Sequence, residues 1–438
     1  MDLGNLRFMK KFFVFVFTLL CLSGFSQQRL TLTDAINIAL KNSYDIQIAQ
    51  GNLDVTVINN YIGMAGALPS VNGSVSDNEQ ITSINQKYAD ATKNTQRDNV
   101  GSNNLAFGVT GSILLYNGKR VSATMKRLEE LKNQNQELLY AQIQNTMAGV
   151  MAKYYDVVRQ QSYLKTILQS IDVSKKKLDI LVVRRQVGVS NDADVFQAQL
   201  DLNALVQSQQ SQQLVIDQAK TDLVNLIFMK PGSQISISDT IIVDKTVNID
   251  SVHHYVILNP NIIAANQQIH INELIEKETA AQRYPTLKAT TGYNFTNASS
   301  AAGFTLLNQS YGPFVGLNLA IPIYNGSIFK RQQQMAVVNT RISRMQRDEL
   351  SVGYESGMFR TYQAYTSSLS QLKTEQENYN LSIKLLDLVL KRFQVGQATI
   401  IDVKQAQQSF EDEGYRLVNL NYAAKAAEIE LKRLAAKL

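Results

Sequence analysis

The sequence contains an internal duplication, which restricts the fold more than any single motif because each copy must form the same unit. Segments of the first half return 208 positions later: Tyr116-Asn117-Gly118 as Tyr324-Asn325-Gly326, and Gln186-Val187-Gly188 as Gln394-Val395-Gly396. Upstream, Leu68-Pro69 matches Tyr284-Pro285 at a spacing of 216. The first copy therefore has extra residues between Pro69 and Tyr116. We expect them in the polar stretch 77–104, as an exposed loop.

The duplication predicts how the chain is divided. A signal peptide occupies residues 1–26, the first copy 27–229, a joining segment 230–250 and the second copy 251–438. Each copy has a helix, two strands, a very long helix, a turn and another helix. In the first copy we expect strands near 69–78 and 104–116, and helices over 119–185 and 192–229. In the second copy we expect strands near 285–296 and 312–324, and helices over 328–392 and 399–437.

The N-terminus has the features of a secretory signal. Lys10 and Lys11 precede an apolar run, and small residues stand before the expected cleavage after Ser26. Met9 is an alternative start to Met1. Cys21, the only cysteine, falls inside this leader, and the bulky Leu20 before it disfavours lipidation. The mature chain is therefore expected to contain no thiol.

Residues 119–185 contain no proline, and apolar residues recur in them at spacings of three and four. A helix of this length extends about 100 Å at ~1.5 Å per residue, which is too long for a globular domain. The periodicity alone favours a coiled-coil rod. The expected strands argue against a simple coiled-coil rod.

Each expected strand has one apolar and one polar face. From Leu105 onward every second residue is apolar or glycine, whereas the residues between them are small or polar. Strands of about ten residues with this alternation are typical of outer-membrane barrels. The residues expected to face lipid are Leu105, Phe107, Val109, Ile113, Leu317, Leu319 and Ile321. Four strands cannot close a barrel, so their open edges are expected to pair with further copies. Two, three or four copies fit this count, and three would supply twelve strands.

Two motifs carry a family resemblance. Arg392-Phe393-Gln394-Val395-Gly396 precedes Asp402-Val403, and Arg184-Arg185-Gln186-Val187-Gly188 precedes Asp194-Val195. With the duplicated layout, these motifs make the chain from about Leu30 to Leu438 resemble the TolC-type outer-membrane efflux proteins. The resemblance implies a mainly α fold with a β-barrel portion: long α-helical hairpins forming a periplasmic α-barrel, and four transmembrane strands per chain in a trimeric twelve-stranded barrel.

The resemblance also implies a function and partners. The chain would be the outer-membrane channel of a tripartite efflux or type I secretion system, reaching into the periplasm. It would work with a periplasmic membrane fusion (adaptor) protein and an inner-membrane pump, and conduct substrates passively. The adaptor would contact the turns, where the residues of interest are Gly188, Gly396, Val187, Val395 and Arg392.

The resemblance places the pore entrance beside these turns. Asp194 and Asp402 stand near the starts of the returning helices, where a carboxylate complements exposed backbone N–H groups. The family pattern implies that they also form acidic rings that favour cations. The family's gate latch uses an aromatic hydroxyl and an arginine, but here these positions read Phe393 and Ala398, and Gln405 replaces a further acid. We therefore expect a gate at Asp194, Asp402, Phe393 and Gln405 that does not use that latch.

Other classes of function have little support. The net charge of +6 is too small and too evenly spread for a nucleic-acid interface. His253, His254 and His270 have no cysteine to complete a zinc site, and no phosphate loop or nucleophile elbow occurs, so we expect neither an enzyme nor a cofactor. The alternative from another class is a periplasmic coiled-coil structural or adaptor protein without a membrane barrel.

Overall fold

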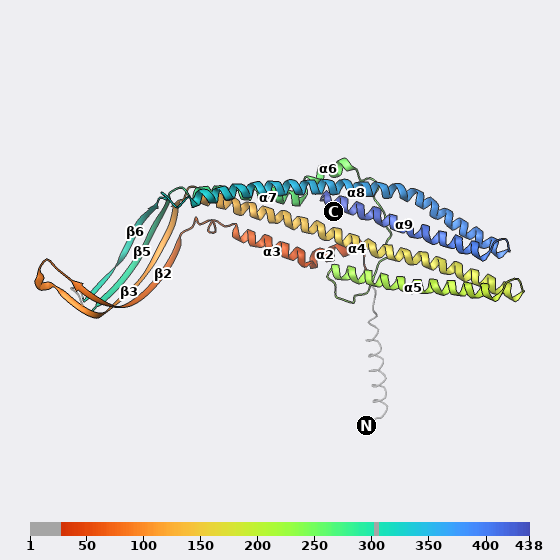
Figure 1. Cartoon of the computed structure of the whole chain (residues 1–438), viewed down its shortest axis with the longest axis horizontal. Helices are drawn as coiled ribbons and strands as arrows, with labels where there is room; N and C mark the ends of the chain where they lie inside the picture. Colours follow the sequence, from red (N-terminus) through yellow and green to blue (C-terminus); the bar gives the residue numbers. More distant parts are fainter. Residues whose placement is uncertain (1–27, 302–305) are drawn as a thin grey trace, which may run out of the picture. The chain divides into compact units, whose positions relative to one another are not determined.

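Long helices dominate the computed structural model, which describes residues 28–301 and 306–438 (Figure 1). The expected signal peptide, with Cys21, lies outside the described residues. Helices α4 (Arg120–Gln186) and α8 (Ile328–Gln394) have 67 residues each, and α5 (Asp192–Leu226) and α9 (Ile400–Leu434) have 35 each. α8 and α9 of the second copy therefore each start 208 positions after α4 and α5, their equivalents in the first copy. In the described part of the chain, no helix is both long and apolar enough to cross a membrane.

The first helix of each copy is divided in two, where we expected one. The first copy has α2 (Leu32–Asn42) and α3 (Tyr44–Asn59), and the second has α6 (Ile249–Val256) and α7 (Pro260–Ala281). Pro260 explains the second break, because a proline is tolerated in the first turn of a helix but not in its interior. α3 and α7 start 216 positions apart.

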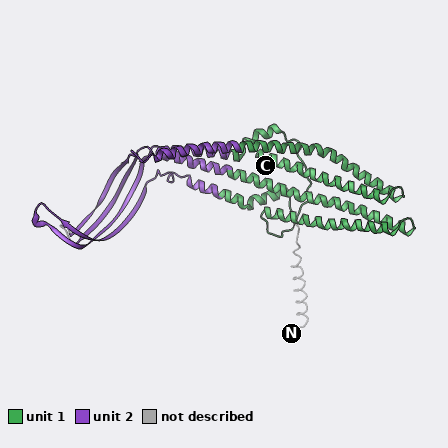
Figure 2. Cartoon of the chain, viewed as in Figure 1, with its two compact units in different colours: residues 1–50, 138–262, 350–438 green, residues 51–137, 263–349 purple. Residues whose placement is uncertain are grey.

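The chain forms two compact units (Figure 2). The first unit comprises residues 1–50, 138–262 and 350–438, and the second comprises 51–137 and 263–349. In the first unit, β1 (Gln28–Arg29) pairs in parallel with β4 (Ile235–Ser236), beside a core that includes Tyr154. The Tyr154 hydroxyl donates a hydrogen bond to the Leu30 carbonyl at 3.1 Å, which ties the start of the described chain to α4.

The second unit contains an antiparallel sheet in the order β2-β3-β5-β6. Its strands are β2 (Ser70–Gln86), β3 (Thr95–Tyr116), β5 (Thr286–Ser300) and β6 (Leu307–Ala320). The central pair, β3 and β5, joins the two copies of the duplication. Because β2 and β6 each pair on one side only, the sheet has two open edges among the described residues.

Two expectations about the strands were wrong. The stretch 77–104 is mostly strand rather than loop, with Asp77 opposite Leu105 and Gln86 opposite Thr95. Backbone pairing carries this polar ladder, and the Asn103 amide adds a side-chain hydrogen bond to Asp77 at 2.6 Å. In the second copy β6 ends at Ala320, so Ile321 lies just beyond it. Pro322, which has no N–H to donate, explains that end.

Candidate functional site: the hairpin turns and the apolar face of the sheet

The two helical hairpins end in turns with the same backbone geometry. Gly188 and Gly396 adopt φ values of +76° and +82°, which glycine tolerates better than other residues. The N–H of Val189 bonds to the Arg184 carbonyl, and the N–H of Gln397 bonds to the Arg392 carbonyl, both at 2.8 Å. This pattern is the Schellman motif, which satisfies the last carbonyl groups of a helix. The sequence pattern Gln-Val-Gly therefore marks a helix end in each copy.

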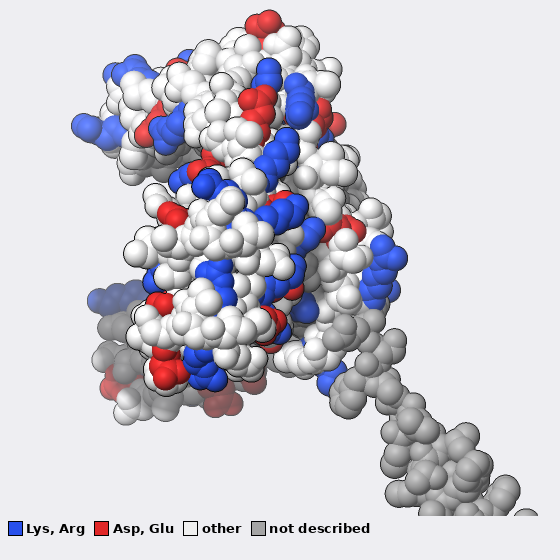
Figure 3. All heavy atoms as spheres, turned by 90° about the vertical axis from the view of Figure 1, so that its right-hand side faces the viewer, with Lys and Arg blue, Asp and Glu red and all other residues white. Residues whose placement is uncertain are grey.

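The side chains at the turns are turned to solvent. Val187 and Val395 are 69% and 70% exposed, although both are apolar. Arg392 is also exposed, and its guanidinium donates a hydrogen bond to the Gln397 carbonyl of its own turn at 3.4 Å. Figure 3 looks onto this end of the chain and shows basic and acidic side chains interspersed among uncharged ones. The turns thus combine exposed apolar groups with charges of both signs.

Asp194 and Asp402 occupy equivalent positions in the first turns of α5 and α9. The Asp402 carboxylate accepts hydrogen bonds from the Thr399 N–H at 2.7 Å and the Thr399 hydroxyl at 2.8 Å, forming a capping box. These bonds hold the pKa of Asp402 below its usual value. In the first copy Asn191 caps the helix, and Asp194 accepts from the Ser190 hydroxyl at 3.2 Å. Asp402 is exposed and Asp194 half-buried.

We expected Phe393 to face the pore entrance, but its side chain is buried inside the chain. Its side chain is 2% exposed and packs with Leu181, Val195 and Val403 between the two hairpins. The Arg184 guanidinium lies 4.7 Å from the centre of its ring and donates a hydrogen bond to its backbone carbonyl. An aromatic residue without a hydroxyl is well suited to this apolar position. Gln405, in contrast, is exposed on α9.

A buried ion pair lies farther along the hairpins from the turns. Lys177 on α4 is 1% exposed, and its ammonium bonds to Asp201 on α5 at 2.9 Å. Asp201 also accepts from the Gln197 amide at 2.9 Å and lies 3.4 Å from the Lys404 ammonium on α9. Burial raises the pKa of Asp201, but bonds from Lys177 and Gln197 outweigh burial and leave its pKa below the usual value. This carboxylate therefore ties three helices of the two copies together.

The sequence patterns did not reveal Arg184, Lys177 and Asp201 as contacts between the copies. Arg184 belongs to a motif that we had noted, but its partner stands 209 positions away. The one available signal is a break in the duplication. At a spacing of 208, Lys177 corresponds to Leu385 and Asp201 to Ser409, so the charges occur in one copy only.

The sheet of the second unit has one continuous apolar face. Directly opposed residues of an antiparallel pair point to the same side. The ladder therefore aligns Val75, Phe107, Phe295 and Tyr311 in one row. The Phe107 and Phe295 rings stack with centres 4.7 Å apart. Neighbouring rows on this face contain Val109, Ile113, Leu317 and Leu319, all chosen from the sequence as lipid-facing.

The opposite face is polar. One of its rows contains Ser70, Ser112, Thr290 and Gly316, and the Ser70 and Ser112 hydroxyl groups are 3.0 Å apart. The apolar residues, in contrast, are exposed: Val109, Leu317 and Leu319 are 53%, 72% and 59% exposed. A sheet with an apolar exposed face and a polar face needs an apolar surrounding on one side.

No metal site is found in the parts of the chain that the structure describes, where no three His, Cys, Asp or Glu side chains come together. The Nδ1 atom of His270 instead lies 3.3 Å from a carboxylate oxygen of Glu273, one turn away on α7.

Known proteins share this architecture. The chain is 23% identical to the outer membrane protein TolC of Vibrio cholerae over 350 residues, which cover 75% of this chain and 76% of the relative. It is 20% identical to the pyoverdine export outer membrane protein OpmQ of Pseudomonas aeruginosa over 421 residues, covering 92% and 81%.

Solved structures agree on the fold. The outer membrane protein VceC of Vibrio cholerae superposes with a TM-score of 0.74 at 18% identity, covering 92% of this chain and 96% of VceC. The outer membrane channel CmeC of Campylobacter jejuni gives 0.76 at 14% identity, covering 93% and 85%. The family model of the outer membrane efflux proteins matches residues 35–229 and 257–437. The chain therefore belongs to the outer membrane efflux protein family, whose members are passive channels of the outer membrane rather than enzymes.

Proposed function

We propose that this chain is the outer-membrane exit channel of a tripartite efflux or type I secretion system. It passively conducts substrates that an inner-membrane pump delivers through a periplasmic adaptor protein. The observation that carries the proposal is the sheet of the second unit, which exposes one apolar face and leaves both outer edges open. In an outer-membrane barrel the apolar face contacts lipid and the polar face lines the lumen.

The open edges favour assembly with other copies of this chain. An unpaired strand edge is a template for pairing, and four strands are fewer than any closed bacterial barrel contains. Three copies would pair β2 of one chain with β6 of the next and close a ring of twelve strands. We therefore propose a homotrimer.

The hairpin turns are proposed as the periplasmic entrance. Asp194 and Asp402 would form rings of carboxylates there and favour cations, with Gln405 exposed one turn after Asp402. The exposed Val187, Val395 and Arg392, carried by the glycine turns, would contact the adaptor. Phe393 contributes to the gate by holding the hairpins together rather than by facing the pore.

The ion selectivity of the channel tests the proposed entrance directly. Purified protein in planar bilayers should form cation-preferring channels, and Asp194→Asn combined with Asp402→Asn should lower the cation preference severalfold. Asp217→Asn, which removes a carboxylate farther along α5, is the matched control and should leave selectivity unchanged. Unaltered selectivity in the double variant would reject the acidic rings but not the channel.

A second experiment tests the membrane face. Val109→Lys places a charge on the apolar face, where lysine at the bilayer centre costs about 2–4 kcal/mol, and should reduce the amount of protein extracted from outer membranes by detergent. Thr110→Lys, the neighbour on the polar face, should assemble normally. If both variants behave alike, or if the wild-type protein is extracted without detergent, the chain is instead a periplasmic coiled-coil protein without a membrane barrel.

A further inference from the structure

The second unit contains one helix that is well packed and an equivalent helix that is not. Residues 263–281 of α7 are covered on nearly all sides, and Ile269, Ile271 and Leu274 are buried. α3, its equivalent in the first copy, has no buried residue. In its part that belongs to this unit, Val55, Val57 and Ile58 are 55%, 51% and 73% exposed. A helix so rich in exposed Val and Ile requires a partner.

α7 contacts two long helices through two different sides. Toward α8 of its own copy, Glu273 pairs with Arg344 at 2.7 Å, and Asn266 accepts from Arg347 at 2.6 Å. Toward α4 of the other copy, Glu278 pairs with Arg127 at 2.7 Å. On that side the Gln134 amide also donates to Gln268 and to the Ala264 carbonyl, at 3.0 and 3.1 Å. α7 therefore lies where a helix of each copy can hold it.

The duplication shows which of these contacts α3 lacks. The contact of α7 with α8 lies within one copy, so its equivalent is the contact of α3 with α4. Leu53 and Thr56, on the side equivalent to Ile269 and Asn272, are indeed partly covered. The contact of α7 with α4 joins the second copy of the duplication to the first. The equivalent contact would join α3, in a first copy, to α8 in a second copy. Because α8 of the same chain is already the partner of α7, this further α8 belongs to another molecule.

The matching side of α8 is exposed and apolar. Residues 127, 130, 134 and 137 of α4 are Arg, Glu, Gln and Glu, and all are partly covered. Their equivalents on α8 are Met335, Val338, Ile342 and Met345, and all are between 44% and 61% exposed. We call these four residues the α8 stripe. At these four equivalent positions the side chains are thus polar on α4, where the rest of the chain partly covers them, and apolar on α8, where they are exposed.

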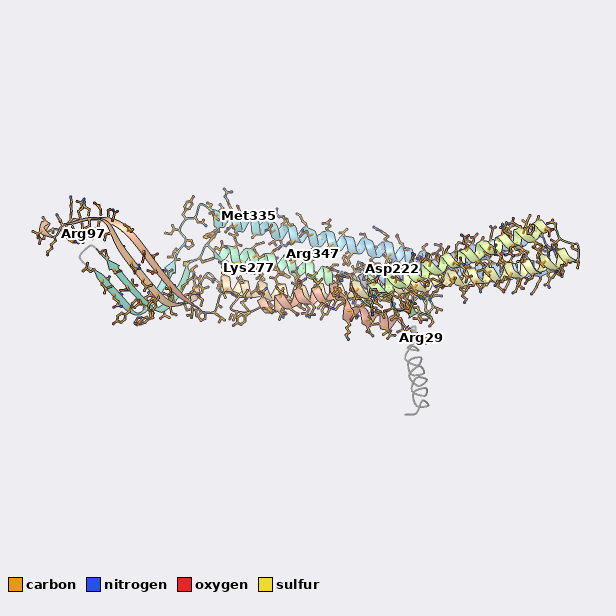
Figure 4. All side chains as sticks on the ribbon, turned by 90° about the horizontal axis from the view of Figure 1, so that it is seen from below. Arg29, Arg97, Asp222, Lys277, Met335 and Arg347 are labelled. Carbon is orange, nitrogen blue, oxygen red and sulfur yellow. The ribbon has the colours of Figure 1, made fainter. Side chains whose placement is uncertain are left out.

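The α8 stripe points away from α7. Met335 and Arg344 are nine residues apart, which is two and a half turns, so they lie on opposite sides of the helix. Figure 4 shows Met335 on the edge of α8 that is turned away from α7, with Arg347 farther along the same helix and Lys277 on α7. A partner can therefore reach the stripe without displacing α7.

We infer that the α8 stripe of one chain binds α3 of the next chain, through the side of α3 that carries Asn52 and Val55. The inference rests on the proposed homo-oligomer and says how its subunits are joined. The contact is heterologous, because two different surfaces meet, and a heterologous contact closes into a ring when the rotation between neighbouring subunits closes. It is apolar, whereas the equivalent contact within the chain is made by an ion pair and amide hydrogen bonds.

The first unit shows the same contrast independently. There the Asp201–Lys404 pair links the two copies within the chain. The equivalents at a spacing of 208 are Ser409 and Phe196, and Phe196 is 63% exposed. Leu385, the equivalent of the buried Lys177, is 47% exposed. Polar contacts inside the chain again correspond to exposed apolar groups on its surface.

Cysteine cross-linking tests the contact at residue level. Gln268 and Gln134 are hydrogen-bonded, and their equivalents are Asn52 and Ile342. Asn52→Cys with Ile342→Cys should give covalent dimers and trimers on a denaturing gel after mild oxidation. Asp54→Cys with Ile342→Cys is the matched control and should give none, because position 54 is equivalent to His270, which faces solvent. Asn52→Cys alone and Ile342→Cys alone are further controls, because any cross-link in these single variants would involve Cys21 or two identical positions.

A charge tests the chemistry of the contact. Val338→Glu with Ile342→Glu should lower the trimer fraction at least tenfold on dilution in detergent, while the helical content by circular dichroism stays unchanged because both side chains are exposed in the single chain. Gln134→Ile, on the covered side of α4, should leave the trimer fraction within about twofold.

The outcomes separate the inference from the proposed function. A channel-forming trimer that does not cross-link through positions 52 and 342, or that tolerates both glutamates, overturns the inference and leaves the channel proposal intact. A wild-type protein that is monomeric and does not conduct overturns both.

Discussion

The two hairpin turns share a backbone and differ in their side chains. Both use a glycine with positive φ and the same pair of terminal hydrogen bonds. Arg184 of the first turn reaches the second copy and lies over the buried Phe393, whereas its equivalent Arg392 stays exposed. The equivalent of Phe393 is Arg185, which is exposed and pairs with Asp192 at 3.2 Å. Duplication therefore preserved the turn, while the contacts between the copies diverged.

The difference shows how a duplicated chain can distinguish its internal contacts from those with other chains. If both copies had identical surfaces, the hairpins within one chain and between two chains could exchange partners, and domain swapping would be favoured. The charges at Lys177 and Asp201 occur in the first copy only, and Arg184 reaches the second copy whereas Arg392 stays exposed, so these contacts select the pairing inside the chain. Substitutions in one copy should therefore have effects that the equivalent substitutions in the other copy lack.

The largest difference is expected at the buried ion pair. Asp201→Ala leaves the Lys177 ammonium buried without its partner, which should lower the free energy of local unfolding of the hairpin by about 3 kcal/mol. Ser409→Ala, at the equivalent position, should change it by less than about 0.5 kcal/mol. Native-state hydrogen exchange of the amides around Asp201 in the first variant and around Ser409 in the second measures the two effects. Similar values for the two variants would mean that Lys177 finds another partner.

Arg184 is expected to have the next largest effect. Arg184→Ala removes the stacking on Phe393 and the bond to its carbonyl group, together about 2 kcal/mol, so amides at the end of α8 should exchange ~30 times faster. Arg392→Ala should change the amide exchange of its own turn by less than about threefold, because the hydrogen bond from Arg392 to the Gln397 carbonyl is long and exposed. Arg184→Lys keeps the charge without the planar stacking and should fall between them. Equal effects of the two alanine variants would remove the asymmetry between the turns.

The glycines should show where the two copies remain alike. Alanine in this left-handed conformation costs about 1 kcal/mol, so Gly188→Ala and Gly396→Ala should each destabilise their turn by that amount. An added Cβ would meet nothing within 4 Å at Gly188, and the Arg184 guanidinium at an ordinary 3.5 Å at Gly396. Local exchange at the two turns should therefore rise equally, and a large difference would indicate that the second turn depends on Arg184 for its backbone geometry as well.

The fold was largely predictable from the sequence because helix ends and strand faces are local features. Gly188 and Gly396 marked the turns, and the alternation from Leu105 identified the apolar face. The polar residues 77–104 misled us, because the neighbouring backbone rather than side-chain hydrophobicity maintains the ladder there. Phe393 and Asp201 could not be placed, because their partners Arg184 and Lys404 are more than 200 positions away in the sequence. Contacts between copies depend on packing in three dimensions, which a repeat pattern does not encode.

The smallest expected difference concerns the two caps and depends on pH. Hydrogen bonds from Thr399 hold the pKa of Asp402 below its usual value, so the ionised carboxylate stabilises the start of α9. That stabilisation is complete above the unfolded pKa of about 4 and is lost as the pH falls through the lower folded value. In α5 the neutral Asn191 amide caps the helix and does not titrate in this range. The first-turn amides of α9 should therefore lose protection as the pH falls below about 4, in exchange measurements corrected for the intrinsic rates, more than those of α5. Asp402→Asn should abolish this pH dependence, and an α9 that responds no more than α5 would show that the Thr399 hydroxyl caps the helix without help from the carboxylate.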